Sequence, residues 1–162
     1  MSGSTDNRAS SAAENSPGPA KVFDLAVARR MLPLVHRIAE EILQSQQQIS
    51  LLIPEQEALD RQRRSLAWPE RARRYQIREE ITGCEQSILQ AQGELESLGL
   101  GLLELDPVRV GFPTLVNNRR AFLSWQPGEE GILFWNYAGD ATRQPIPVSW
   151  MKQANLTLVS HR

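Results

Sequence analysis

The sequence predicts an α+β fold, in which a long antiparallel helical hairpin carries a small three- to four-stranded antiparallel β-meander at its base. Two apolar runs predict the hairpin, because each keeps an alternating spacing of three and four residues and Trp68-Pro69 separates them. A shorter apolar period after Gly99, interrupted by turn-forming residues, predicts the meander. Together these observations indicate a domain with an elongated coiled-coil arm.

Each apolar run forms one narrow seam along its helix, and a turn between the runs lets the two seams face each other. The first seam consists of Ala28, Met31, Val35, Ile38, Ile42, Ser45, Ile49, Leu52, Gln56 and Leu59. The second seam consists of Ile77, Ile81, Cys84, Ile88, Ala91, Leu95 and Leu98. Apolar residues beside the seams stay partly uncovered on a two-helix hairpin and invite a partner; they are Leu43, Leu51, Ile53 and Leu89.

The first helix is predicted to begin after Asp24, whose side chain can cap the first-turn amides, and to run to about Leu66. Pro33 and Pro54 interrupt it, and each is expected to kink or break the helix because proline lacks an amide donor. The second helix is predicted from Pro69, a favoured first helical residue, to about Gly99, a favoured stop.

The meander is predicted from short runs rich in aromatic and β-branched residues. Its strands are expected at Leu103–Leu105, Val108–Val116, Ala121–Trp125 and Ile132–Tyr137. Pro113 implies a sheet edge or a bulge, and Asn117-Asn118 predicts a tight turn because asparagine tolerates positive φ. A further short strand is expected at residues 156–159, inside a weakly patterned tail.

These elements divide the chain into four predicted parts. Residues 1–21 are rich in Ser, Ala, Asn, Gly and Pro and predict a disordered tail. The hairpin covers 22–99, the meander packed on its base covers 100–148, and a C-terminal tail covers 149–162.

Composition narrows the functional classes. The formal net charge is −1, so no global field marks a nucleic-acid or membrane binder, and no apolar run is long enough for a membrane span. The single cysteine, Cys84, excludes a disulfide framework within the chain and favours a cytoplasmic location.

Several short motifs resemble a bacterial family of uncharacterised proteins, a domain-of-unknown-function family. The N-terminal part of the resemblance is Phe23-Asp24-Leu25 followed by Met31-Leu32-Pro33-Leu34, which matches the Leu-Pro-Leu helix that opens family members. The meander part consists of Gly111-Phe112-Pro113, Trp125, Gly128-Glu129, Trp135, Gly139, Arg143 and Pro145. The resemblance covers about residues 22–146 and implies the hairpin and meander fold, without an assigned activity.

One position departs from that family. Its members usually carry a histidine followed by an acidic residue after the second tryptophan, where this chain has Asn136 and Tyr137. If the histidine-acid pair moves protons or binds a metal in the family, this chain has lost that function.

Chemistry-bearing clusters are scarce in the sequence. Metal sites need clustered His, Cys and carboxylates, whereas His36 and His161 stand far apart, so we expect no metal site and no cofactor. Cys84 lies on a seam and is expected to be a buried, inert thiol. With no nucleophile–base pair visible either, no catalytic residue is assigned and no enzymatic activity is expected.

The charge order around the turn is unusual. Residues 61–78 hold seven arginines and one acidic residue, whereas residues 79–106 hold seven acidic residues and no base. Arginines with interleaved aromatic residues could grip phosphates and stack on bases. The candidate nucleic-acid-binding residues are Arg63, Arg64, Trp68, Arg71, Arg73, Arg74 and Arg78.

Two alternatives explain the same charges without nucleic acid. In the first, the turn is solvated and its arginines pair along or across the helices with acidic neighbours, namely Glu55, Glu57, Asp60, Glu79 and Glu80. In the second, two copies associate head-to-tail or antiparallel, so that a positive tip meets an acidic shaft.

A small-molecule or peptide pocket in the meander is the other candidate site. It would be lined by aromatic residues with an arginine for an anion, and its residues are Arg109, Trp125, Trp135, Asn136 and Arg143. The alternative is structural, because a small sheet needs large aromatic side chains to bury enough area.

The sequence therefore predicts a non-catalytic cytoplasmic coiled-coil protein for interaction or scaffolding, which associates with itself or with a protein partner. The alternative function is nucleic-acid association through the arginine-rich tip.

Overall fold

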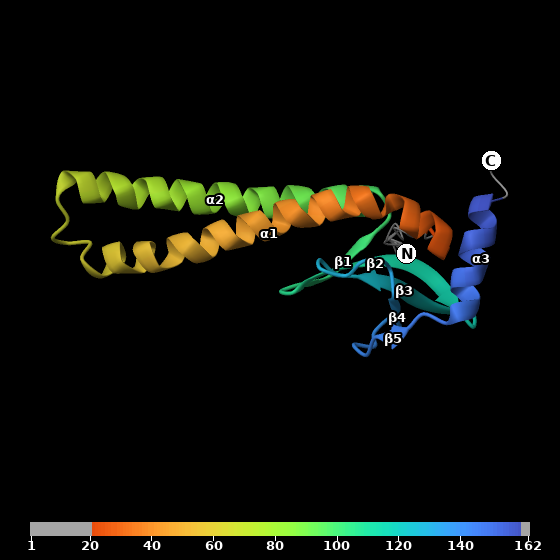
Figure 1. Ribbon diagram of the computed structural model, residues 1–162. Helices are drawn as coiled ribbons and strands as arrows, with labels where there is room; N and C mark the ends of the chain where they lie inside the picture. The colour runs from red at the N-terminus through yellow and green to blue at the C-terminus, as the bar shows by residue number, and fades with distance from the viewer. Residues whose placement is uncertain (1–20, 160–162) are drawn as a thin grey trace, which may run out of the picture.

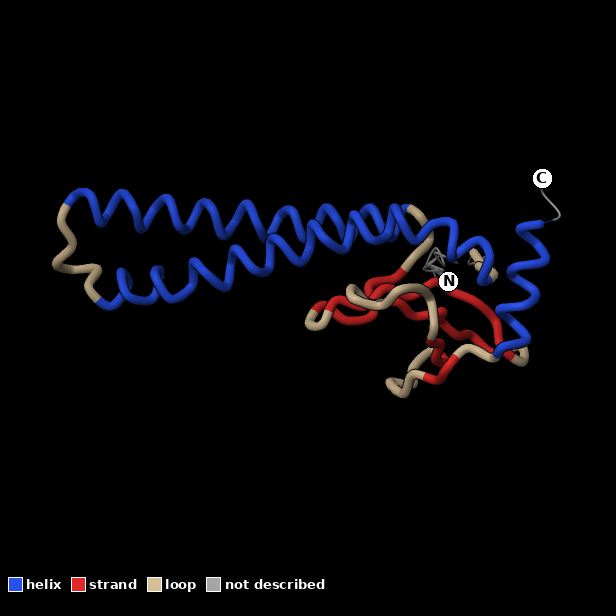
Figure 2. Tube along the Cα trace, in the orientation of Figure 1, coloured by secondary structure: helices blue, strands red, loops and turns tan. Residues whose placement is uncertain are grey.

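The computed structural model describes residues 21–159 as two long helices, a five-stranded sheet and a short C-terminal helix. In chain order the elements are α1 (Leu25–Arg61), α2 (Trp68–Ser97), β1 (Gly101–Leu105), β2 (Val108–Val116), β3 (Arg119–Trp125), β4 (Phe134–Tyr137), β5 (Gln144–Pro145) and α3 (Val148–Val159). The helical hairpin extends far beyond the sheet, which packs only against its base (Figures 1 and 2). This arrangement confirms the predicted α+β class.

The two predicted seams hold the hairpin together. Every residue of both seams is buried or half-buried, and Ile42, Ile77 and Leu95 are fully enclosed. We call the paired stretch, residues 38–61 and 68–91, the shaft. The predicted exposure of its flanking apolar residues is confirmed for all four positions: Leu43, Leu51, Ile53 and Leu89.

Of the two outcomes expected at Pro33 and Pro54, a kink or a break, the break does not occur, because α1 continues through both. Both prolines lie on the exposed side, where water can bind the carbonyls of Arg29 and Ser50 that lose their amide partners. The first turns of α1 bend away from the line of the shaft toward the sheet (Figure 1). The helix also ends at Arg61 and not at the predicted residue 66.

Asp24, Pro69 and Gly99 lie at the helix ends where the sequence predicts them. Asp24 accepts a hydrogen bond from Val27 N at 2.8 Å, and Pro69 occupies the first turn of α2. Gly99 ends α2 with φ = 84°, while Leu100 N donates to Leu95 O at 2.9 Å. This left-handed glycine cap satisfies carbonyls that the helix end would otherwise leave free.

Two glycine-to-alanine substitutions should have opposite effects on stability. At Gly99 a Cβ would sit 2.9 Å from Lys21 Cδ on a left-handed backbone, so Gly99→Ala should lower the free energy of unfolding by roughly 1–2 kcal/mol. At Gly93, inside α2 and in open space, Gly93→Ala should raise it by roughly 0.5–1 kcal/mol. Urea unfolding of both variants checks the pair, and a Gly99→Ala chain as stable as the unsubstituted one would contradict the cap assignment.

The sheet is an antiparallel meander whose spatial order equals its chain order, β1-β2-β3-β4-β5. The prediction of three or four strands missed β5, because two residues are too short for any periodicity. Asn117 and Asn118 have φ of 52° and 59°, which confirms the tight turn. Pro113 lies beyond the end of β1, so that side of β2 is locally an edge, and its carbonyl accepts from Phe23 N at 2.8 Å.

The C-terminal segment corrects two predictions. Residues 148–159 form α3 and not a tail, and the strand expected at 156–159 lies within this helix. Trp150 and Ala154, four residues apart, share one helical face, and Trp150 packs on Trp135 with ring centroids 5.5 Å apart. A short apolar run cannot by itself distinguish a strand from a buried helix turn. The tail predicted for 1–21 lies, apart from residue 21, outside the described residues.

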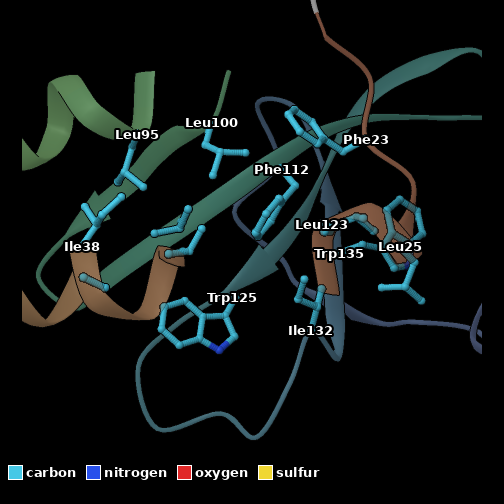
Figure 3. Close-up of a cluster of buried hydrophobic side chains, with 14 of the residues drawn as sticks. Phe23, Leu25, Ile38, Leu95, Leu100, Phe112, Leu123, Trp125, Ile132 and Trp135 are labelled. Carbon is cyan, nitrogen blue, oxygen red and sulfur yellow. The ribbon is translucent and has the colours of Figure 1, made fainter. Parts of the chain in front are cut away.

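One core joins the sheet to the base of the hairpin. We call the sheet face toward α1 the inner face and the opposite one the outer face. Phe112, Leu123 and Trp125 on the inner face belong to the same hydrophobic core as Ile38 of α1 and Leu95 of α2 (Figure 3). Between residues 21 and 159, none of the helices combines the length and apolar character needed to cross a bilayer.

Candidate functional site

The five residues predicted to line a pocket in the meander lie on different faces of the sheet. Neighbouring residues of a strand point to opposite faces, and the register places Trp125 and Trp135 on the inner face. Arg109 and Asn136 occupy outer-face positions, and Arg143 reaches the same face through Ser124. The five side chains therefore do not line one cavity.

The two tryptophans are part of the core. Trp125 is 1% exposed, lies 5.7 Å from the His36 ring, and donates from Nε1 to Glu129 O at 3.3 Å. Trp135 is packed between Tyr137 and Trp150. These contacts match the structural alternative, in which large aromatic side chains provide the buried area of a small sheet.

Of the five predicted pocket residues, Arg143 makes the most hydrogen bonds to other residues. Its guanidinium donates to both oxygens of Glu129, at 2.6 and 3.0 Å, and to Ser124 Oγ and O, at 3.0 and 3.2 Å. It also lies over the Phe134 ring, 4.4 Å from the centroid. We call this arrangement the Arg143 clasp; it ties the loop after β3 and the segment before β5 to the outer face.

Arg109 and Asn136 also have structural partners. Arg109 donates to Glu104 Oε1 at 3.0 Å, and Asn136 Nδ2 donates to the carbonyls of Tyr137 and Asp140 at 3.1 and 3.0 Å. Arg109 Nε and Asn136 Oδ1 are buried and find no partner among the described residues.

The two positions that depart from the resembled pattern have ordinary packing roles. Asn136 orders the turn that follows β4 through its two carbonyl contacts. Tyr137 Oη accepts from Asn117 Nδ2 at 3.3 Å, and the Arg119 guanidinium lies 4.0 Å from the Tyr137 ring centroid. Within residues 21–159 there is no group of three or more His, Cys, Asp or Glu arranged to hold a metal ion.

The arginine-rich tip, residues 61–78, divides into paired and unpaired arginines. Arg73 donates to both oxygens of Glu55, at 2.8 and 3.0 Å, and reaches Glu80 at 3.5 Å. Arg74 donates to Asp60 at 2.5 Å. For these two arginines, the alternative of pairing with acidic neighbours is confirmed.

Arg61 Nε donates to the Glu57 carbonyl at 3.3 Å, and the remaining four arginines at the tip extend into solvent. Their side chains are exposed and form no ion pair among the described residues; they are Arg63, Arg64, Arg71 and Arg78. Trp68 and Tyr75 beside them are 73% and 62% exposed. The end of the hairpin is less positive than the count along residues 61–78 implies, because antiparallel packing brings the acidic end of α1 beside it.

We expect the pKa of Glu55 to lie below its usual range, because Arg73 donates hydrogen bonds to the carboxylate and adds a nearby positive charge. Since this pKa is lowered in the folded state, the pair stabilises the hairpin above the unfolded-state pKa. That contribution is lost as the pH falls through the lowered value. A carboxyl-carbon NMR titration should return Glu55 toward its usual pKa in Arg73→Gln and leave it lowered in Arg71→Gln. An unchanged titration in Arg73→Gln would contradict the assignment.

Two hollows lie near the base of the hairpin. A groove of about 590 Å³ separates the shaft from the β1–β2 turn and is lined by Leu43, Gln46, Gln47, Ile49, Ser50, Ile53, Ile88, Leu105 and Asp106. A smaller cavity of about 280 Å³ lies among the start of α1, the end of β2 and α3. Neither contains the five predicted pocket residues.

Comparison with known proteins gives one match. The family described as an uncharacterized conserved protein (DUF2203) matches residues 21–146, which include the hairpin, all five strands and the Arg143 clasp. No curated protein and no solved structure matches the chain. The matched residues nearly coincide with those of the resemblance drawn from the motifs.

Proposed function

The chain belongs to the DUF2203 family of uncharacterised conserved proteins, and from that premise we propose that it is a non-catalytic interaction protein whose helical shaft scaffolds an assembly. The polar residues best suited to chemistry in the meander support this proposal, since Arg143 and Asn136 are committed to structural contacts. The half-buried thiol of Cys84 on the seam supports a reducing, cytoplasmic setting.

The observation that carries the proposal is the exposure of large apolar side chains on both helices of the shaft. Leu51 on α1 and Leu89 on α2 are 66% and 67% exposed, and Trp68 at the start of α2 is 73% exposed. Large apolar side chains grouped on one exposed element mark interaction surfaces. A second copy of the chain is the partner that we propose first, because one chain carries both a basic and an acidic stretch.

Sedimentation equilibrium of the purified chain tests this function. We expect the average mass to rise from 18.3 kDa toward twice that value as concentration increases over about a hundredfold range. A mass that stays at one subunit throughout would contradict self-association. Static light scattering at matched concentrations provides an independent measurement of the same quantity.

A second candidate function is nucleic-acid binding, and the four unpaired arginines beside exposed Trp68 favour it. Fluorescence anisotropy of labelled single-stranded and duplex oligonucleotides would then show affinity that falls steeply with salt. Reversing Arg63 and Arg64 to glutamate should abolish it without disturbing the shaft. Reversing the charges of Arg73 and Arg74 would not separate lost nucleic-acid contacts from a destabilised hairpin, because both arginines form ion pairs between α1 and α2.

A further inference from the structure

The outer side of α2 carries an apolar stripe with helical spacing. Trp68, Tyr75 and Leu89 are the large apolar residues that α2 exposes, by 73%, 62% and 67%, and they occur seven and fourteen residues apart. Thr82, also exposed, fills the remaining heptad position between Tyr75 and Leu89. Residues seven apart lie on one face of a helix, so these four side chains form a single line, which we call the α2 stripe.

The α2 stripe faces away from the rest of the molecule. At about 100° per residue, the nine positions from Trp68 to the buried seam residue Ile77 make about two and a half turns, so Trp68 lies on the side of α2 opposite Ile77. In Figure 1, α2 runs along the edge of the shaft opposite the sheet. The stripe therefore has room beside it for another helix along its whole length.

The charges of α2 reverse at the midpoint of this stripe. Before the midpoint lie Glu70 and the basic residues Arg71, Arg73, Arg74 and Arg78; Arg73 and Arg74 are paired with α1, which leaves Arg71 and Arg78 to face a partner. After it lie only acidic residues, namely Glu79, Glu80, Glu85, Glu94 and Glu96. The change of sign falls between Arg78 and Glu79, which is also halfway between Trp68 and Leu89.

We propose that the α2 stripe binds the same stripe of a second copy in antiparallel orientation, an interface that rests on the self-association proposed above. A twofold axis near residues 78 and 79 would place Trp68 of each copy against Leu89 of the other, and the basic half against the acidic half. A parallel pair would instead bring like charges together along the whole length. The contact is symmetric, so it closes as a dimer and leaves the groove beside the β1–β2 turn free.

One cross-subunit ion pair follows from this register. Arg71 and Glu85 lie on the same side of the stripe, seven residues to either side of Arg78, and neither side chain has an ion pair among the described residues. In the antiparallel dimer, Arg71 of one copy faces Glu85 of the other, and the symmetry makes this contact twice.

The first test removes the apolar contact. Trp68→Ala with Leu89→Ala should raise the dimer dissociation constant by about tenfold or more in sedimentation equilibrium, as expected for buried aromatic anchors. The matched control is Leu51→Ala, which removes a side chain equally exposed in the monomer but on α1. The control should leave the constant within about twofold of the unsubstituted chain. Circular dichroism of each variant verifies that the helices persist.

The second test exchanges the charges. Arg71→Glu alone and Glu85→Arg alone should each weaken the dimer, because each creates two like-charge contacts, and the double variant should restore it to within about twofold. A chain that is monomeric at every concentration overturns self-association and this interface together. A dimer unaffected by the stripe variants overturns this interface alone. A dimer that needs the stripe but is not rescued by the double exchange overturns the antiparallel register.

Discussion

Replacing Arg143 by alanine should lower the free energy of unfolding by about 3–5 kcal/mol, the range for breaking one side of a buried ion pair. The Arg143 and Glu129 side chains are 15% and 14% exposed, so the substitution leaves a carboxylate buried without its cation. Ser124, fully buried beneath them, loses two donors at the same time. Urea unfolding followed by circular dichroism measures the loss.

Two companion variants identify the cause. Replacing Arg143 and Glu129 together by leucine should cost clearly less than Arg143→Ala, because no isolated charge then remains buried. Arg109→Ala should also cost less, since its partner Glu104 is 42% exposed and keeps contact with water. A loss below about 1 kcal/mol in Arg143→Ala would show that the clasp is not needed to hold the outer face.

Trp125→Ala should destabilise the fold by about 3–5 kcal/mol, the usual cost of deleting a buried aromatic side chain. Its ring fills the space between β3 and the base of α1, beside His36, and its removal leaves a cavity in a closely packed core. Thermal unfolding and urea midpoints measure the effect.

The comparison for this prediction is Trp68→Ala, which removes the same side chain from a position that is 73% exposed. In the monomer it should change stability by no more than about 0.5 kcal/mol. Equal losses in the two variants would mean that the ring of Trp125 does not pack as described. The pair also separates folding from association, because Trp68 belongs to the α2 stripe.

The helical hairpin could be predicted from the sequence because a seam depends on local spacing, and every predicted seam residue is at least half-buried. The turn at Asn117-Asn118 and the cap at Gly99 could be predicted for the same reason, since their φ values follow from residue type. The continuity of α1 through Pro33 could not be predicted from the sequence, because it depends on which side of the helix faces water.

The candidate sites were harder to predict than the fold. Alternation along a strand tells which residues share a face, but the sequence does not say that Arg143 turns back onto Ser124 and Glu129. The residues of the α2 stripe lie between seam positions, so the seam pattern assigns them only to the turn or to the uncovered flanks. Their heptad spacing is the signal in the sequence that identifies the stripe.

The hairpin also shortens the path by which this chain folds. Phe23 N bonds to Pro113 O across about 90 residues, and loop closure costs more entropy as the intervening chain lengthens. Once α1 and α2 pair, Gly99 already lies beside Phe23, so only about 14 residues separate Pro113 from the part of the chain that Phe23 contacts. That reduction lowers the closure cost by roughly 1.5 kcal/mol, and within the sheet each strand pairs only with strands next to it in the sequence. The arm that presents the α2 stripe thus also brings the two halves of the core together early.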